Sequence, residues 1–120
     1  MKALNVLYTY ESLATLTDER LDLNTAMIIA ENMKTLTAPK QVIDEKRFKL
    51  IKTYAEKDNN GNLKKNTDGT IIFSEANAKE CDKKLAALLS EDIDIELTKI
   101  KKSALADIKI SPTLVLGLMD

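Results

Sequence analysis

Residues 24–57 have the sequence NTAMIIAENMKTLTAPKQVIDEKRFKLIKTYAEK, and this stretch decides the fold. Its apolar side chains return every three or four positions, as they do on one face of an amphipathic helix. No other part of the chain has so long a periodic pattern, so we expect the remaining elements to pack on it. The repeating positions are Ile29, Met33, Leu36, Ile43, Leu50 and Tyr54.

Pro39 lies in the middle of this stretch. A proline inside a helix removes one backbone hydrogen bond and clashes with the preceding turn, at a cost of about 3 kcal/mol. Thr37 is a suitable cap for a helix that restarts there, with Pro39 in its first turn. The sequence therefore predicts a kink or break near residues 35–38 and two helices, over residues 24–36 and 38–57.

The apolar seam of this stretch has two interpretations. It can pack against the helices before and after it, or it can serve as a self-association or partner-binding surface. Lys40 and Arg47 occupy places where apolar residues would complete the repeat, so the seam is an imperfect coiled coil. Its candidate partner-binding residues are Ile29, Met33, Ile43 and Leu50.

Residues 3–16, upstream of this stretch, have the spacing of a shorter amphipathic helix. Leu4, Leu7 and Tyr8 form one apolar stripe, and Val6, Tyr10 and Leu13 form another beside it. A polar connection follows, and Asn24 or Thr25 is the expected cap of the long helix.

Two turn signals follow the long helix, at residues 58–62 and 66–69, because Asn, Asp and Gly tolerate a left-handed backbone. Residues 63–65 and 70–73 can form a hairpin across the second turn, with a protruding loop as the alternative for the short, polar first arm. Ser74 then begins a third helix that extends to about Leu89, with Cys81 on its apolar face. We expect Cys81 to be a buried packing residue, with a reactive thiol as the alternative.

Two short strands are predicted near the end of the chain. Residues 93–97 alternate apolar and acidic side chains, and residues 108–110 alternate again after a turn at residues 103–105. Ser111 and Pro112 are typical of a helix start. The short helix that follows would carry a second candidate partner-binding face at Leu114, Leu118 and Met119.

These elements together predict an α+β fold in a single domain over residues 1–120. A helical layer contains the N-terminal helix, the long Pro-interrupted helix and the third helix. A two- or three-stranded antiparallel sheet and a short C-terminal helix complete it. A chain of 120 residues suffices for one core and is too short for two independent ones.

Composition excludes several kinds of chemistry. There is no histidine and a single Cys, which disfavours zinc sites and Ser-His or Cys-His catalysis. With only 3 Gly, no phosphate-binding loop is present. We therefore expect a protein that is not an enzyme and uses no metal or other cofactor.

The charge and hydropathy patterns also bear on partners and location. A net charge of -1 creates no overall field for nucleic acid or an anionic membrane. No apolar run approaches the roughly 20 residues that cross a bilayer, and no signal-peptide core follows Met1. These features, with the single Cys81, predict a cytoplasmic protein that does not bind a membrane.

Three local clusters of polar residues allow other sites. Asp58, Asn60 and Asn62 imitate the start of a calcium loop, but Leu63 stands where that loop needs glycine, which favours a simple turn. Residues 92, 94 and 96 place three carboxylates on one strand face, as a metal or acid-base cluster or, more simply, as a solvated face. Nucleic-acid binding is the alternative function, through Lys99, Lys101, Lys102 and Lys109.

Several motifs, in order along most of the chain, resemble a family of short uncharacterised proteins encoded by phages and prophages of Gram-positive bacteria. In that family a long charged helix ends in a Tyr-Ala-Glu-Lys-Asp-x-Asn-Gly turn, which residues 54–61 resemble. The next helix ends in a Leu-Leu pair, here Leu88 and Leu89. The later similarities are a strand like residues 93–97, a Ser-x-Leu segment at residues 103–105 and an Ile-Ser-Pro helix start at residues 110–112.

The resemblance implies a viral origin and an intracellular setting in an infected bacterium. Pro39 departs from it, because the family's long helix is expected to be uninterrupted. The family has no assigned catalytic residues, so no functional position is transferred. We expect a non-enzymatic protein-interaction module, for which a homo-oligomer is one possible form. Its expected partner is a phage structural protein in particle assembly or a host defence protein that it inhibits.

Overall fold

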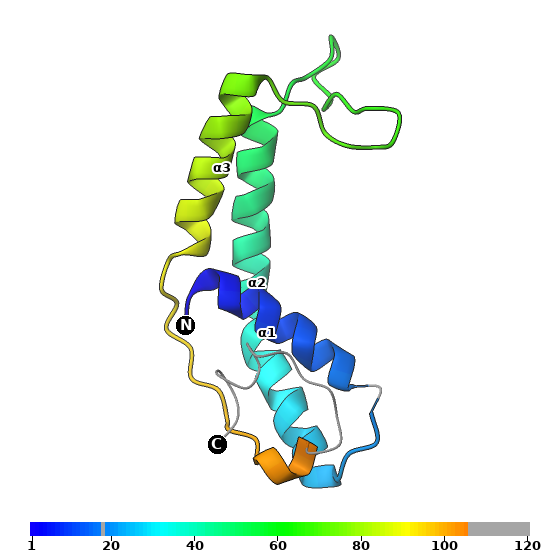
Figure 1. Ribbon diagram of the computed structural model, residues 1–120, viewed down its shortest axis with the longest axis vertical. Helices are drawn as coiled ribbons and strands as arrows, with labels where there is room; N and C mark the ends of the chain where they lie inside the picture. The colour runs from blue at the N-terminus through cyan, green and yellow to red at the C-terminus, as the bar shows by residue number, and fades with distance from the viewer. Residues whose placement is uncertain (18, 106–120) are drawn as a thin grey trace. The chain divides into compact units, whose positions relative to one another are not determined.

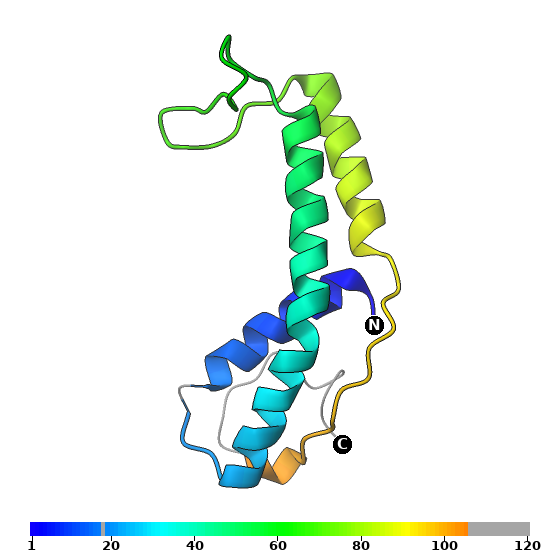
Figure 2. The same ribbon diagram turned by 180° about the vertical axis from the view of Figure 1, so that it is seen from behind.

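The computed structural model describes residues 1–17 and 19–105 of the chain. Three α-helices and one 3-10 helix follow in order (Figures 1 and 2), namely α1 (Ala3–Leu16), α2 (Leu23–Tyr54), α3 (Glu75–Leu89) and η1 (Lys102–Leu105). The chain divides into two compact units, with the boundary inside α2. We call residues 1–42 and 92 onward the terminal unit, and residues 43–91 the middle unit. The single domain over residues 1–120 stays a prediction.

The predicted α+β class is wrong for the described residues, which contain helices and isolated β-bridges but no strand or sheet. Residues 93–97, the best strand candidate, are extended without a strand partner. A strand needs a neighbouring strand to pair its backbone groups, and alternation along the chain does not supply one. The other predicted strand (residues 108–110) and the C-terminal helix lie outside the described residues.

Helix α1 has the limits that the sequence predicts, Ala3–Leu16, and its buried face includes Val6 and Leu13 of the second predicted stripe. The predicted stripe of Leu4 and Tyr8 is exposed, by 36% and 49%. Helix α1 crosses the part of α2 that belongs to the terminal unit (Figures 1 and 2), and the small side chains on its buried face allow a close approach there. The buried side chains of α1 are Ala3, Val6, Thr9, Leu13 and Leu16.

Helix α2 begins one residue earlier than predicted, and its cap is Asp22 instead of Asn24 or Thr25. The Asp22 carboxylate accepts hydrogen bonds from the Thr25 backbone N–H (3.2 Å) and the Thr25 hydroxyl (2.5 Å). An acidic cap satisfies the free N–H groups at a helix start and complements the positive end of the helix dipole.

The predicted break at Pro39 is absent, because α2 is continuous from Leu23 to Tyr54. Two threonines in the turn before Pro39 form side-chain hydrogen bonds to backbone carbonyl groups four residues earlier. The Thr35 hydroxyl donates to the Glu31 carbonyl (3.1 Å) and the Thr37 hydroxyl donates to the Met33 carbonyl (2.7 Å). Burial of Leu36 and Ile43 on either side of the proline favours a continuous helix over the local cost of Pro39.

Within the terminal unit, hydrogen bonds hold the extended segment after α3 against the N-terminus and α2. Ile93 exchanges two with Met1, at 2.7 and 3.0 Å. Further along, the buried Asn32 side chain donates to the Thr98 carbonyl and accepts from the Thr98 N–H, both at 2.9 Å. One side-chain amide thus replaces a strand partner, and the next apolar residue, Ile100, is buried.

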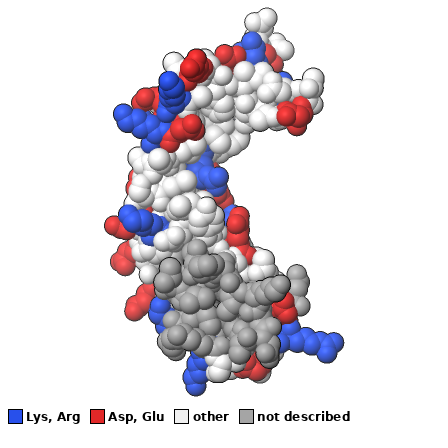
Figure 3. Space-filling view, in the orientation of Figure 1, with Lys and Arg blue, Asp and Glu red and all other residues white. Residues whose placement is uncertain are grey.

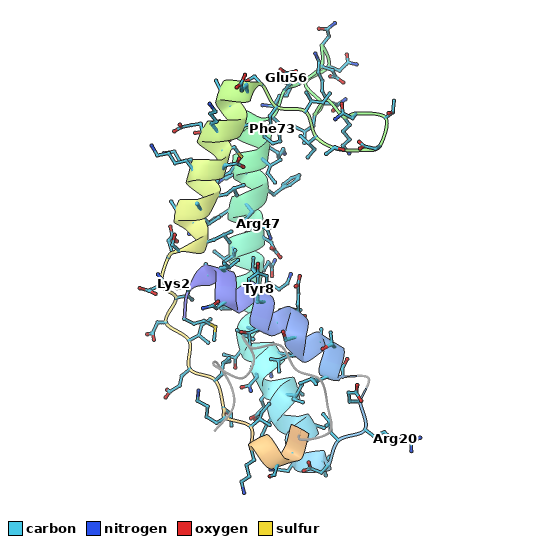
Figure 4. All side chains as sticks on the ribbon, viewed as in Figure 1. Lys2, Tyr8, Arg20, Arg47, Glu56 and Phe73 are labelled. Carbon is cyan, nitrogen blue, oxygen red and sulfur yellow. The ribbon has the colours of Figure 1, made fainter. Side chains whose placement is uncertain are left out.

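In the middle unit, α3 runs antiparallel to residues 43–54 of α2 (Figures 1 and 2). The predicted start of α3 is confirmed, since the Ser74 side chain caps it by accepting from the Asn77 N–H (3.2 Å). The loop that connects the two helices covers residues 55–74, with Glu56 near its start and Phe73 near its end (Figure 4). The unit's buried apolar residues are Ile43, Ala55, Cys81 and Leu88.

This loop contains an eight-residue structural repeat that the sequence analysis missed. Each repeat is a tight turn closed by one antiparallel bridge, Lys57 to Leu63 in the first and Lys65 to Ile71 in the second. Each turn contains a glycine with positive φ, Gly61 at 81° and Gly69 at 87°, in a backbone region that favours glycine. The two turns form separate lobes (Figures 1 and 2).

A ring of three backbone hydrogen bonds joins the two lobes. Glu56 donates to Ile72 (2.9 Å), Ile72 donates to Lys64 (3.0 Å), and Lys64 donates to Glu56 (2.9 Å). The three residues are spaced eight apart, so the repeat itself closes the ring. The predicted hairpin across the second turn is therefore present only as a single bridge within this arrangement.

No helix within the described ranges is both long and apolar enough to cross a membrane.

Candidate functional site

The two helices of the middle unit form a groove between them. Its volume is about 390 Å³, within the range of roughly 300–1,000 Å³ for ligand sites. Helix α2 contributes one wall. Helix α3 contributes the other, together with Glu91, which follows the C-cap residue Ser90. The lining residues are Lys46, Lys49, Leu50, Thr53, Lys84, Ala87, Leu88 and Glu91.

Helical spacing brings these residues together. On each wall they lie at positions i, i+3, i+4 and i+7, which share one face of a helix. The floor is mostly apolar, with Leu88 buried, Leu50 half-buried and Ala87 exposed. Because Ala87 has only a methyl group, it leaves open the space that a longer side chain would occupy.

Charged side chains surround this floor. Lys46, Lys49 and Lys84 are exposed, and within the described ranges none of them forms a salt bridge. Their ammonium groups are therefore available to carboxylates of a bound molecule. Glu91 adds one negative charge beyond the C-terminal end of α3, so the rim is not uniformly basic.

Charges of both signs lie close together on the visible face of the middle unit (Figure 3). On the face shown in Figure 3, Lys and Arg side chains lie next to Asp and Glu side chains along α3. Arg47, next to the groove residue Lys46, is already paired with Asp44 at 3.3 Å (Arg47 is labelled in Figure 4).

The candidate partner-binding seam of the long helix is mostly inside the fold. Ile29 is 3% exposed and Ile43 is 2% exposed, while Met33 and Leu50 are half-buried. Leu50 alone among them lines the groove. The other predicted face, Leu114, Leu118 and Met119, lies outside the described residues, and partner binding by these residues stays a prediction.

The lysines of the alternative function are only partly described. Lys99 and Lys101 are exposed on the extended segment before η1, and Lys102 is the first residue of η1. Lys109 lies outside the described residues. Nucleic-acid binding by this group stays a prediction.

The acidic candidates form no metal site within the described residues, where no group of three or more possible ligands comes together. Asp92, Asp94 and Glu96 point to solvent from the extended segment. In the imitation of a calcium loop, Asp58 Oδ1 instead accepts from the N–H groups of Asn60 (2.9 Å) and Asn62 (3.0 Å). These bonds form a turn, as the sequence predicts.

Cys81 is buried and free, which confirms its prediction as a packing residue. Its thiol lies 4.0 Å from the Leu50 carbonyl oxygen. Burial, and secondarily the negative charge of Asp82, raise the pKa of this thiol above its ordinary value. A thiol with a raised pKa carries little thiolate at neutral pH, so Cys81 is a poor nucleophile.

Sequence reasoning missed most of the groove. Lys84, Ala87 and Glu91 were assigned to no site, although their spacing with Leu88 already places them on one face of α3. The missing information was the register between α3 and α2, because these helices are joined by a long loop. A groove that two helices share has no signature within either one.

The sequence matches no protein-family model, and comparisons with curated proteins and with solved structures likewise give no match.

Proposed function

We propose that this chain is a non-enzymatic, phage-encoded protein-interaction module that acts in the cytoplasm of an infected bacterium. Its partner is a virion protein during particle assembly or a host defence protein that it inhibits. The groove between α2 and α3 is the site that binds this partner.

The observation that carries this proposal is the combination of an apolar floor with three lysines that form no salt bridge within residues 1–17 and 19–105. A hydrophobic centre with a polar rim is the usual anatomy of a protein interface. Charges on the rim increase the association rate and select the partner, while the apolar centre supplies most of the affinity.

The residues around the groove favour binding over catalysis. Its titratable side chains are three lysines and Glu91, and all four are exposed, whereas burial is one of the features that adapt a side chain for acid-base work. The buried Cys81 is also unsuited to act as a nucleophile.

The test is site-specific photo-crosslinking in an infected culture that produces the chain. A photo-crosslinking amino acid replaces Ala87 in the groove or, as a control, the exposed Ala76 of α3 outside it. A covalent adduct with one protein is expected from position 87 and not from position 76. Mass spectrometry of the adduct then separates assembly, with a virion protein, from inhibition, with a host defence protein.

Two charge-reversed variants show whether the adduct depends on the groove. The variant Lys46→Glu, Lys49→Glu and Lys84→Glu is expected to lose it. The control, Lys57→Glu, Lys65→Glu and Lys79→Glu, changes the net charge equally on exposed residues outside the groove and is expected to keep it. Equal adducts from positions 76 and 87, none at all, or an adduct that survives the groove variant would reject the proposal.

A further inference from the structure

We propose that the segment bound in the groove is an acidic amphipathic helix of the partner, which packs as a third helix against α2 and α3. This inference rests on the proposed function and specifies the secondary structure and charge of the bound segment. It follows from three properties of the groove, namely its backbone groups, its length and its charges.

The backbone of the groove walls decides the secondary structure of the occupant. Both walls are formed by helices, whose N–H and C=O groups are bonded within each helix. An extended segment on the apolar floor would bury backbone groups without partners, because there is no strand edge with which it could pair. A helix satisfies its own backbone, and its side-chain ridges fit between those of two neighbouring helices.

The length of the groove sets the length of the contact. On α2 the lining extends from Lys46 to Thr53, which is about 10 Å at a rise of roughly 1.5 Å per residue. On α3 the lining from Lys84 to Glu91 covers the same number of positions. About two helical turns of the partner can therefore lie on the floor, with apolar side chains at positions i and i+4 directed toward Leu50, Ala87 and Leu88.

The rim determines the charge of the partner. Lys46 and Lys49 on one wall and Lys84 on the other lie on both sides of the bound helix, where carboxylates next to its apolar stripe can reach them. Glu91 repels a carboxylate at its end of the groove and favours a basic side chain there. The occupant is thus acidic along both edges, with one basic residue near Glu91.

A displayed library of helical peptides tests this inference without knowledge of the partner. Each 15-residue peptide has an alanine-rich helical scaffold with leucine at positions i and i+4, and the positions beside this pair are randomised. Selection on the full-length chain should enrich Asp and Glu at those positions. Selection on the Lys46→Glu, Lys49→Glu, Lys84→Glu variant should enrich Lys and Arg instead.

Binding of a selected peptide gives a quantitative check. The groove variant should bind it at least about tenfold more weakly, since it replaces three attractive charge pairs at the rim with repulsive ones. Ala87→Trp, which fills the floor without a change of charge, should also abolish binding. The Lys57→Glu, Lys65→Glu, Lys79→Glu control should bind as the unmodified chain does.

The two proposals can fail separately. Enrichment of neutral or basic peptides, or the same enrichment on the groove variant, overturns the acidic helix. The same holds if the peptide segment crosslinked from position 87 in infected cells is not an acidic amphipathic helix. Acidic helices selected in vitro without any adduct at position 87 in cells would instead overturn the proposed function and leave the chemistry of the groove intact.

Discussion

At the scale of single residues, Thr9 is the one polar side chain in the described part of the chain that is buried without a hydrogen-bond partner. It is completely inaccessible, and its Oγ1 contacts no donor or acceptor. A buried hydroxyl without a partner has lost its bonds to water and gained none in return. Thr9 belongs to neither of the apolar stripes that the sequence predicts, and the packing of α1 buries it.

We expect Thr9→Val to stabilise the protein by about 1–2 kcal/mol, because valine has nearly the same shape and no hydroxyl to desolvate. Thermal unfolding measures this as an increase in Tm. Thr15→Val is the matched control on the same helix, since Thr15 is exposed and its hydroxyl donates to the Ser12 carbonyl (2.7 Å). A destabilised Thr9→Val variant would show that the hydroxyl has a partner in solution.

Asp68 gives a second residue-scale prediction, through its titration. The Thr70 hydroxyl and then the Thr70 N–H donate to Asp68 Oδ1, and both bonds lower the pKa of Asp68 below its ordinary value of 3.8. The pKa of Asp68 is lower in the folded protein than in the unfolded chain. Its carboxylate therefore stabilises the fold at any pH above the ordinary pKa of 3.8. This contribution is lost as the pH falls through the folded pKa.

A pH titration of carboxyl chemical shifts by NMR should therefore place the midpoint of Asp68 below 3.8. In Thr70→Val the hydroxyl is absent, and the midpoint should return toward the ordinary value. The N–H of residue 70 remains in this variant, so the return should be partial. A midpoint of Asp68 that is identical in both proteins would contradict the hydrogen bond to the hydroxyl.

At the scale of elements, α2 shows how burial prevails over local preference. Pro39 costs about 3 kcal/mol inside a helix, which is why the sequence predicts a break there. Nevertheless α2 is one helix, with Leu36 and Ile43 buried before and after the proline. The apolar periodicity was thus a better guide to this helix than the proline.

Pro39→Ala should stabilise the protein by roughly 2 kcal/mol. Alanine restores the N–H that bonds to the carbonyl four residues earlier, and the more flexible unfolded chain offsets up to about 1 kcal/mol of this gain. Denaturant unfolding with an unchanged m value would measure it. A loss of stability would mean that the half-buried proline ring contributes more to packing than the missing hydrogen bond costs.

The loop between α2 and α3 shows the opposite case, in which local sequence is decisive. Gly61 and Gly69 are eight residues apart, as are Lys57 and Lys65, and the two turns have the same geometry. Both turns were therefore predictable from Asn, Asp and Gly. The ring that joins Glu56, Lys64 and Ile72 was not, because it depends on how two turns pack together.

At the scale of the whole molecule, contacts between distant residues replace the predicted sheet. Asn32 and Thr98 are 66 residues apart and share two hydrogen bonds, and Met1 meets Ile93. These contacts hold the segment after α3 on the terminal unit without a strand partner. The alternation of residues 93–97 still has its expected effect, since Ile93, Ile95 and Leu97 are half-buried and the acidic residues between them are exposed.

Asn32→Leu should destabilise the protein by about 2–3 kcal/mol, because it removes two hydrogen bonds and leaves both Thr98 backbone groups without their partner. Hydrogen exchange at the Thr98 amide should become faster in the same variant. Thr98→Ala is the matched control and should have little effect, since the exposed Thr98 side chain takes no part in these bonds. Unchanged exchange at residue 98 in Asn32→Leu would contradict this anchor.

The sequence by itself determined the features that depend on near neighbours in the chain. These are the limits of α1, the cap of α3 at Ser74, the burial of Cys81 and the two glycine turns, because helical spacing, capping and backbone preference act over a few residues. Only the tertiary structure decided the continuity of α2 through Pro39, the absence of a sheet from the described residues and the groove between α2 and α3. Each of these depends on which distant residues meet, and hence on burial and backbone pairing that no single segment encodes.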